Sequence, residues 1–456
     1  MQGMNSRSVD LIYLDPPFNS KANYAAPIGS RAAGAHFKDT WGLDDIKREW
    51  IEEIEADNTA TWSIITAAGY THGESSQAYL TYMAIRLLEM RRLLKPTGSI
   101  YLHCDPTMSH YLKALLDAIF GKDNFRSEII WKRSSAHNDA KQGRRQHGRI
   151  HDVLLFYSRS PEWTWNPLFR PYDQQYIDRF YRHVEPKTGR RYRLGDLTGP
   201  GGAAKGNPEY EVMGVRRFWR YSEEKMTRLI EEGRVVQSAP GRVPAYKRYL
   251  DEQPGVTLQD IWSDIGPISS QAKERMGFPT QKPIALLKRI IAASSNPGDV
   301  VLDPFCGCAT TCVAAELLSR QWAGIDVSVK ALDLVIERLQ KGADTEAIFK
   351  DKELPAIHHL TRPPKRTDAD APKRSRNIKG ILFREQQGRC AGKCGDDGEG
   401  RSLPLDLFEL DHIKPRSKGG PDIDSNLQLL CATCNRKKGS KTMTYLLGLT
   451  SQQEMF

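Results

Sequence analysis

The hydrophobic pattern of this chain alternates between short apolar runs and amphipathic stretches. Apolar runs suited to buried strands occur at residues 11–14, 299–302 and 322–326, and another lies within residues 98–106. Helix-compatible stretches occur at residues 111–120, 284–294 and 312–318. Strands that alternate with helices predict an α/β fold built on a Rossmann-like sheet.

Two regions break this rhythm. Residues 134–271 are rich in Arg, Tyr, Trp, Gly and Pro and lack the alternation of strand and helix, so we predict an insertion into a sheet domain that spans residues 1–340. Residues 361–380 hold three prolines and seven Lys or Arg against two Asp, with few apolar residues. This composition predicts a basic linker at residues 341–380, which either touches phosphates or is a solvated spacer.

A turn rich in small residues runs from Asp303 to Thr311, between an apolar run and a helix. Small residues in such a turn let the backbone approach a ligand closely, and the helix begins with free N–H groups. The carboxylate of Asp303 comes first, so the ligand is expected to carry a positive charge. An ordinary strand-to-helix connection remains the alternative.

A second turn, Asp15-Pro16-Pro17-Phe18, ends the apolar run at residues 11–14. Proline fixes φ and lacks an N–H, so the carbonyls of this turn are held outward with free acceptor capacity. Asp15 and the Pro16 carbonyl can together accept hydrogen bonds from one exocyclic amino group, and Phe18 offers a face on which an extruded base can stack. A plain Asp-Pro turn after a strand is the alternative.

The order of these segments resembles that of the β-class DNA amino-methyltransferases, which use S-adenosylmethionine, and the resemblance covers roughly residues 9–340. It implies that Asp303 contacts the methionine amino group and that Asp326 contacts the ribose hydroxyls. It also implies that Phe305 and Gly307 bind the cofactor and that residues 278–283, with Lys282 as the polar candidate, help line its pocket.

In this family an Asp-Pro-Pro-Phe turn goes mainly with adenine. The resemblance therefore implies a site-specific enzyme that methylates the N6 amino group of adenine in double-stranded DNA, with Asp15, Pro16, Pro17 and Phe18 forming the catalytic turn. It places target recognition in the insertion at residues 134–271, and relatives often pair as homodimers. Individual arginines and tryptophans there are interpreted as surface charges and packing residues: Arg144, Arg145, Arg170, Arg190, Arg191, Trp163, Trp165 and Trp219.

Three features qualify the resemblance. Relatives usually carry another strand and helix ahead of the run at residues 11–14, where they contact the cofactor's adenine ring, and a shorter start would weaken cofactor binding. Ala309 replaces a glycine that is usual in the cofactor turn, and we expect its methyl group to be tolerated. His103 and Asp105 are interpreted as structural, because polar residues at strand ends often cap the next helix.

Four of the eight cysteines form two close pairs, Cys390 with Cys394 and Cys431 with Cys434. Paired thiols separated by an insert of moderate length suit a tetrahedral zinc site of four thiolates. Two disulfides are the alternative, which an intracellular enzyme without a secretory leader disfavours.

The residues between and after these pairs closely resemble the HNH, or ββα-metal, endonucleases, which predicts a small zinc-framed nuclease domain at residues 381–445. By that resemblance His412 is the general base, Asp411 and Asn435 hold one magnesium ion, and Asn426 braces the loop that orients His412. An imidazole that titrates near neutral pH suits proton transfer, and hard oxygen ligands suit magnesium.

Composition agrees with these interpretations. A chain of 456 residues with 39% hydrophobic content can form more than one core, and no stretch reaches the apolar length needed to span a bilayer. We therefore expect a cytoplasmic protein without membrane contact, encoded by a bacterium, an archaeon or a phage. The net charge of +10 favours a polyanion such as DNA as partner, although a basic solvated surface would give the same charge.

Three hypotheses follow. The first is an enzyme that both methylates DNA and cuts it. The second is a methyltransferase whose HNH module only binds DNA. The third is an N-terminally truncated pseudo-methyltransferase that keeps DNA binding or nuclease activity. The sequence does not give the recognition site.

Overall fold

The computed structural model describes residues 1–20, 22–34, 36–135, 145–328, 330–341, 356–364, 366–368, 377–395, 398–418 and 423–451. Arg144 and much of the predicted linker at residues 341–380 lie outside the described residues. Within the described ranges, no helix is long and apolar enough to cross a membrane.

A seven-stranded sheet lies at the centre of one compact unit, which comprises Met1–Asn166 and Asp260–Phe456. The strand order is β15-β5-β6-β4-β1-β16-β17. Strand β6 pairs antiparallel with both neighbours, and the other pairs are parallel. The strands are β1 (Val9–Leu14), β4 (Leu94–Cys104), β5 (Phe125–Lys132), β6 (His151–Ser158), β15 (Ile261–Trp262), β16 (Val300–Asp303) and β17 (Gln321–Gly324). The predicted α/β fold with a Rossmann-like sheet is confirmed.

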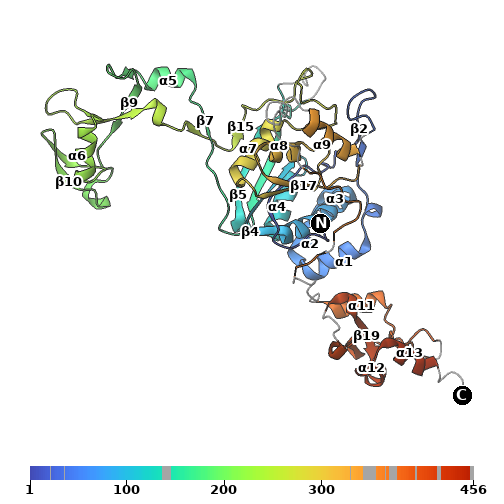
Figure 1. Cartoon of the computed structure of the whole chain (residues 1–456). Coiled ribbons are helices and arrows are strands. Elements are labelled where there is room, and N and C mark those ends of the chain that lie inside the picture. The colour runs from blue at the N-terminus through green and yellow to red at the C-terminus, as the bar shows by residue number, and fades with distance from the viewer. Residues whose placement is uncertain are drawn as a thin grey trace. The chain divides into compact units, whose positions relative to one another are not determined.

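Helices cover both faces of this sheet, which explains why its central strands are apolar at nearly every position (Figure 1). Successive side chains of β1 point to opposite faces, so Ile12 packs in one core and Tyr13 in the other. The first core contains helices α1 (Arg48–Asp57), α2 (Thr59–His72), α3 (Glu74–Leu93) and α4 (Ser109–Phe120). The second contains α7 (Ile284–Ser294), α8 (Thr310–Leu317) and α9 (Lys330–Lys341). A small hairpin, β2 (Ala22–Ala25) and β3 (His36–Asp39), follows β1.

The second compact unit comprises Pro167–Gln259 and lies within the predicted insertion at residues 134–271. It is narrower than that range because β6 and β15 belong to the central sheet. A four-stranded sheet of order β12-β13-β9-β8 and a hairpin of β10 and β11 build it. Its elements are β7 (Phe169–Arg170), α5 (Gln174–Phe180), β8 (His183–Val184), β9 (Arg191–Asp196), β10 (Glu209–Val212), β11 (Val215–Phe218), α6 (Glu223–Glu231), β12 (Val235–Val236), β13 (Ala245–Tyr249) and β14 (Val256–Thr257).

In the second unit, Trp219 packs in the interior, whereas the arginines Arg190 and Arg191 form ion pairs. Trp219 is fully buried and donates its Nε1–H to the Tyr210 carbonyl at 2.8 Å, so its interpretation as a packing residue is confirmed. Trp165, outside this unit, is 51% exposed. Arg190 pairs with Asp251, and Arg191 pairs with Asp178.

The C-terminal residues form a small ββα arrangement around their own core. Strands β18 (Phe408–His412) and β19 (Leu427–Cys431) pair antiparallel, and α12 (Ala432–Lys438) follows directly. Helices α11 (Ile378–Glu385) and α13 (Met443–Ser451) flank them. The ββα fold expected of the C-terminal domain is confirmed, and its flanking helices extend beyond the predicted residues 381–445 at both ends.

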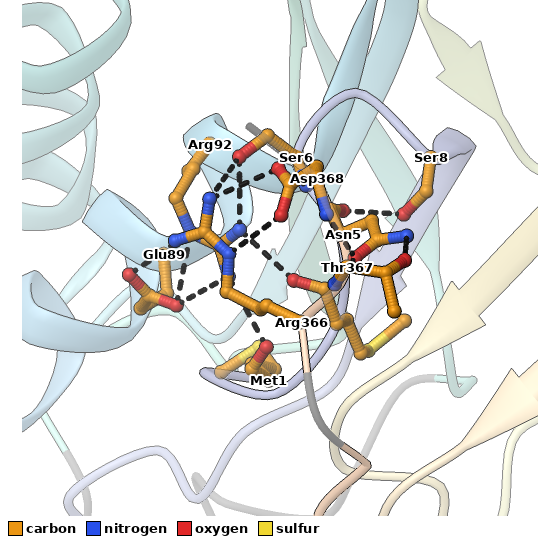
Figure 2. Close-up of polar contacts among 10 residues, drawn as sticks. Met1, Asn5, Ser6, Ser8, Glu89, Arg92, Arg366, Thr367 and Asp368 are labelled. Atoms are coloured by element: carbon orange, nitrogen blue, oxygen red, sulfur yellow. Dashed lines mark hydrogen bonds and ion pairs between the residues drawn. The ribbon is translucent and has the colours of Figure 1, made fainter. Parts of the chain in front are cut away.

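A short part of the predicted linker binds the N-terminal residues of the chain (Figure 2). We call Pro363, Pro364 and Arg366–Asp368 the docked segment. Ser6 N–H donates to Asp368 Oδ2 at 2.8 Å, and Arg366 Nη2 donates to Ser6 Oγ at 2.9 Å. Arg92 holds the other side of the N-terminal residues by donating to the Met1 and Met4 carbonyls. This part of the linker is therefore held by specific contacts.

Candidate active sites

A cavity of about 590 Å³ lies at the carboxyl edge of the sheet, where β1 and β16 end. These strands are parallel neighbours, with Ile12 opposite Leu302, so the residues that follow them meet at one edge. Asp15 and Asp303 both line this cavity. The turn expected to hold the target amino group and the turn expected to hold the cofactor therefore share one cavity.

The target turn, residues 15–18, lies on one side of the cavity. Asp15 Oδ2 accepts a hydrogen bond from Lys282 Nζ at 2.5 Å, whereas Asp15 Oδ1 is buried and has no hydrogen-bond partner among the described residues. A buried acceptor without a donor is costly, so this arrangement suits a ligand that donates a hydrogen bond. The Phe18 ring also lines the cavity and lies against His103, with centroids 6.1 Å apart.

Three buried polar side chains connect β1, β4 and β6 beside the target turn. Tyr13 Oη and His103 Nδ1 are 2.8 Å apart, and His103 Nε2 is 3.3 Å from Asp152 Oδ2. Arg133 Nε lies 3.1 Å from the other Asp152 oxygen. Burial raises the pKa of Tyr13 well above its ordinary value, and Asp15 adds to the effect. Burial is the largest influence on Asp152 and opposes its ionisation, but the hydrogen bond and electrostatic interaction with His103, together with the positive charges of Lys282 and Arg133, outweigh it, so the pKa of Asp152 is lowered.

Asp303 is the last residue of β16 and is only 3% exposed. Its carboxylate accepts hydrogen bonds from Phe305 N at 3.0 Å and from Thr311 Oγ1 at 2.5 Å. Burial raises the pKa of Asp303 to about 7, although the hydrogen bonds from Thr311 and Phe305 oppose the rise. A cation bound at this carboxylate would lower its pKa again, so the position suits a ligand ammonium group.

The rest of the cofactor turn is held in place by Asp326. Gly307 N–H donates to Asp326 Oδ2 at 2.8 Å, and Ser328 N–H donates to Asp326 Oδ1 at 2.8 Å. Gly307 has φ of +51°, and a Cβ there would lie 3.1 Å from the Phe278 ring, so glycine suits both the conformation and the space. Phe305, Gly307 and Asp326 all line the cavity.

The four cysteine thiols of the C-terminal unit meet at one point. The sulfur atoms of Cys390, Cys394, Cys431 and Cys434 all lie within 4.8 Å of one another, the only such cluster of possible metal ligands among the described residues. Four thiolates at this spacing suit tetrahedral zinc. The zinc would join α12 and β19 to the loop after α11.

Asp411 and His412 end β18, next to the start of β19. Asp411 accepts a hydrogen bond from Gln428 Nε2 at 2.9 Å and forms an ion pair with Lys438 Nζ at 3.0 Å. Carboxylate and amide oxygens suit magnesium, and Asp411 offers such a group once Lys438 moves aside. Asn435, on α12, donates its amide to Glu409 Oε2 at 2.6 Å.

The Asn426 side chain binds both backbone groups of Lys414, two residues after His412. Its Oδ1 accepts from Lys414 N at 2.9 Å, and its Nδ2 donates to the Lys414 carbonyl at 3.1 Å. These contacts are of the kind expected of a residue that braces the loop beside His412.

Sequence reasoning missed three of these neighbours. The structure joins Tyr13 to His103 and Lys282 to Asp15 although each pair is far apart in the chain. It also buries Lys438, which is 1% exposed, whereas a lysine in a basic run resembles a surface charge. The sequence showed that His103 lies at the end of a strand and that Lys282 lies near the cofactor pocket. It did not show that His103 contacts Tyr13 or that Lys282 contacts Asp15.

Comparison with known families assigns the larger part of the chain. Residues 9–337 match the DNA methylase family, so the chain belongs to that family. Residues 390–441 match the HNH endonuclease family, so the chain combines a DNA methylase with a C-terminal HNH domain. The resemblance inferred from the sequence is confirmed.

The chain is similar to several restriction-modification proteins. It is 35% identical to the type II methyltransferase M.EcaI of Enterobacter cloacae, over 58% of this chain and 58% of that protein. It is 26% identical to the type III restriction-modification enzyme StyLTI Mod subunit of Salmonella typhimurium, over 71% of this chain and 49% of that protein. It is 25% identical to the DNA adenine methyltransferase YhdJ of Escherichia coli, over 81% and 86%. The chain thus spans only about half to three fifths of the first two relatives.

Solved structures with a similar arrangement include the complex of M1.HpyAVI with S-adenosylmethionine, at 15% identity and a TM-score of 0.34 over 73% of this chain and 89% of that one. TTHA0409 of Thermus thermophilus, complexed with S-adenosyl-L-methionine, is similar at 14% identity and a TM-score of 0.36 over 81% and 94%.

Proposed function

We propose that this chain transfers a methyl group from S-adenosylmethionine to the N6 amino group of adenine in DNA. The observation that carries the proposal is the single cavity lined by both Asp15 and Asp303. The Asp-Pro-Pro-Phe turn supports adenine as the target base, and the similarity to a protein named as a DNA adenine methyltransferase agrees with it.

The cofactor, when bound, supplies a methyl group on a positively charged sulfur. Asp303 would hold its ammonium group and Asp326 its ribose, and Phe305 and Gly307 would lie beside them; all four residues line the cavity, which supports these roles. Asp15 and the Pro16 carbonyl accept hydrogen bonds from the amino group of a flipped base, and Phe18 stacks on its ring. These contacts hold the amino nitrogen in line for direct transfer, so no covalent enzyme intermediate is needed.

The experiment is a methyl-transfer assay with labelled cofactor and plasmid DNA, followed by mass spectrometry of the nucleosides. We expect 6-methyladenine, and we expect Asp15→Ala to abolish it while cofactor binding stays nearly intact. Asp44→Ala removes an exposed carboxylate and serves as the matched control. Label found as 4-methylcytosine would overturn the choice of base, and unchanged transfer by Asp15→Ala would remove the role of Asp15. Calorimetry that shows no cofactor binding by the wild-type protein would favour the pseudo-methyltransferase.

We further propose that the HNH domain cleaves DNA with magnesium, using His412 as general base and Asp411 with Asn435 as metal ligands. The metal would stabilise negative charge on the phosphate. The ion pair between Asp411 and Lys438 favours the competing function, a module that binds DNA without cutting it, because the Lys438 ammonium already neutralises the carboxylate that would bind the metal ion.

A nicking assay on supercoiled plasmid, with and without magnesium, separates these two functions. We expect magnesium-dependent strand breaks that His412→Ala abolishes without loss of the zinc-bound fold. Breaks at the original rate in His412→Ala would make His412 structural, and no breaks in the wild-type protein would leave DNA binding as the function of the domain. Whether two copies of the chain pair as a homodimer stays a prediction, which sedimentation with and without DNA would test.

A further inference from the structure

The ammonium group of Lys282 lies where the target turn meets the loop before α7. It is buried, donates to Asp15 Oδ2 at 2.5 Å and to the Thr280 carbonyl at 3.2 Å, and lies 5.3 Å from the centre of the Phe18 ring. A lysine ammonium has three N–H groups. Two have acceptors here, and Lys282 has no third hydrogen-bond partner among the described residues.

The backbone around Lys282 is held in a strained conformation. Thr280 has φ of +62°, which is unfavourable for a β-branched residue, and this conformation presents its carbonyl to Lys282. Gln281 supports the loop by accepting from Met276 N at 2.8 Å and donating to the Glu274 carbonyl at 2.7 Å. Such strain persists only where the surroundings fix it, so the position of the Lys282 ammonium is set before any ligand binds.

The edge of a flipped base offers an acceptor for the third N–H of the Lys282 ammonium. In adenine the exocyclic amino group, a donor, lies beside the ring nitrogen N1, an acceptor, and cytosine has the same pair at N4 and N3. Guanine and thymine carry a hydrogen on the corresponding ring nitrogen. A carboxylate beside an ammonium therefore matches adenine or cytosine and repels the other two bases.

We propose that Lys282 donates its third N–H to N1 of the target adenine while Asp15 accepts from the N6 amino group. This assignment rests on the proposed adenine methylation. The Asp15 carboxylate then accepts hydrogen bonds from the Lys282 ammonium and from the N6 amino group at the same time. Together with the bond from Lys282 to N1, these contacts form a closed ring of hydrogen bonds along the base edge. Lys282 thereby selects the base and fixes its rotation in the cavity.

The contact serves to select and orient the base and does not activate the amino nitrogen electronically. A donor at N1 withdraws electron density from the amino nitrogen, whereas the Asp15 carboxylate returns it. Because Lys282 also keeps a positive charge against Asp15, the carboxylate orients the amino group and is poorly suited to remove its proton beforehand.

The test is a cycle between enzyme variants and base analogues. The methylated position is first mapped with the wild-type protein, and duplexes are then made with adenine, 1-deazaadenine or 7-deazaadenine at that position. Single-turnover transfer is measured for the wild-type protein, Lys282→Met, which keeps the length but has no donor, and Lys282→Arg, which keeps donors. We expect 1-deazaadenine to slow the wild-type protein roughly 10- to 100-fold, as for a lost hydrogen bond to a charged group.

Lys282→Met should transfer methyl groups to 1-deazaadenine as fast as to adenine, because it has no donor to lose. Lys282→Arg should still be slowed by 1-deazaadenine, but less than the wild-type protein. The 7-deazaadenine duplex should cost the wild-type protein and Lys282→Met the same factor. The proposal is overturned if 1-deazaadenine slows transfer by the same factor in the wild-type protein and in Lys282→Met. It is also overturned if the two proteins differ only in how much 7-deazaadenine slows them. If Lys282→Met is too slow to assay, the same cycle is measured as duplex binding in the presence of cofactor. Failure of the proposed function appears earlier, as absence of methylated adenine in the mapping step.

Discussion

Single carboxyl groups decide much of the chemistry in the cavity. The pKa of Asp303 is raised to about 7 because the group is buried, with Asp15 and Asp326 adding negative charge nearby. The two hydrogen bonds that oppose this rise do not restore an ordinary pKa. The charge that a cofactor ammonium would meet therefore depends on pH within the physiological range.

This raised pKa predicts a pH dependence of cofactor binding. Below pH 7 Asp303 is protonated and neutral, so affinity for S-adenosylmethionine should fall roughly tenfold per pH unit. Above about pH 8 the ligand loses its own ammonium proton, so affinity should fall again. Calorimetry between pH 5.5 and 9 would show a maximum between about 7 and 8. Asp303→Asn should lose the acidic limb of the curve, and a wild-type affinity that is constant below pH 7 would contradict the assignment.

Ala309 carries a backbone cost that the sequence did not show. It precedes α8 in the left-handed region, with φ of +58° and ψ of 32°. The residue is buried, and an L-residue in this region of backbone conformation costs about 1–2 kcal/mol relative to glycine.

Ala309→Gly should therefore raise the free energy of unfolding by about 1 kcal/mol, since glycine adopts this conformation without the steric cost but is more flexible when unfolded. Urea unfolding of the two proteins would measure the difference. Ala315→Gly, in the middle of α8, is the matched control and should destabilise by a similar amount. A destabilised Ala309→Gly would show that packing of the methyl group outweighs the backbone conformation.

At the scale of elements, the sequence predicted the strands whose ends carry the site and missed those that depend on distant partners. The apolar runs before Asp15 and Asp303 lie in β1 and β16. They could be predicted because a strand that is covered on both faces is apolar at nearly every position. Strand β6 was assigned to the insertion since a basic, irregular stretch precedes it. Its place beside β4 follows from pairing with residues about fifty positions away, which a local pattern does not contain.

The contact between the docked segment and the N-terminal residues also could not be predicted from local sequence patterns. Prolines and basic residues indicate an extended linker, and they do not show that Arg366 and Asp368 match the polar groups of Ser6. The contact depends on Arg92, at the end of α3, which holds the N-terminal residues in a conformation that presents Ser6.

Gly3 gives a direct test of this contact. A Cβ at Gly3 would lie 1.8 Å from the Pro364 carbonyl oxygen, so Gly3→Ala should displace the docked segment. We expect trypsin to cut after Arg366 several times faster in the variant, as followed by mass spectrometry. Gly42→Ala, where the added methyl group meets no atom within 4 Å, should leave the cutting rate unchanged. Equal rates in all three proteins would show that this segment already detaches freely.

At the scale of the whole molecule, the methylase part and the HNH domain each have a core of their own. The methylase core consists of large aliphatic clusters on both faces of a sheet, whereas the C-terminal core is small and includes the cysteines themselves. A core of that size gains much of its stability from metal binding. The four-cysteine cluster and the resemblance to HNH endonucleases could be predicted from the sequence, because the cysteines and the motif residues all lie within about fifty consecutive residues.

Removal of the metal should therefore unfold only the C-terminal unit. In Cys434→Ser, zinc measured by atomic absorption should fall sharply and calorimetry should lose the transition of residues 377–451, while the methylase transition and methyl transfer stay unchanged. Cys104→Ser changes a buried cysteine outside the cluster and should keep the zinc content of the wild-type protein. Full zinc content in Cys434→Ser would contradict a four-thiolate site.

The docked segment also sets the length of the tether to the nuclease domain. Nine residue steps separate Asp368, bound to Ser6, from Asn377, where the C-terminal unit begins. A fully extended chain covers at most about 3.3–3.6 Å per residue, so this tether reaches roughly 30 Å. That length corresponds to about nine base pairs of duplex at 3.4 Å each. While Asp368 stays bound, the start of the HNH domain cannot travel further from the methylase than about one turn of the double helix, and the cleavage proposed for this domain would be confined to the neighbourhood of the DNA that the methylase binds.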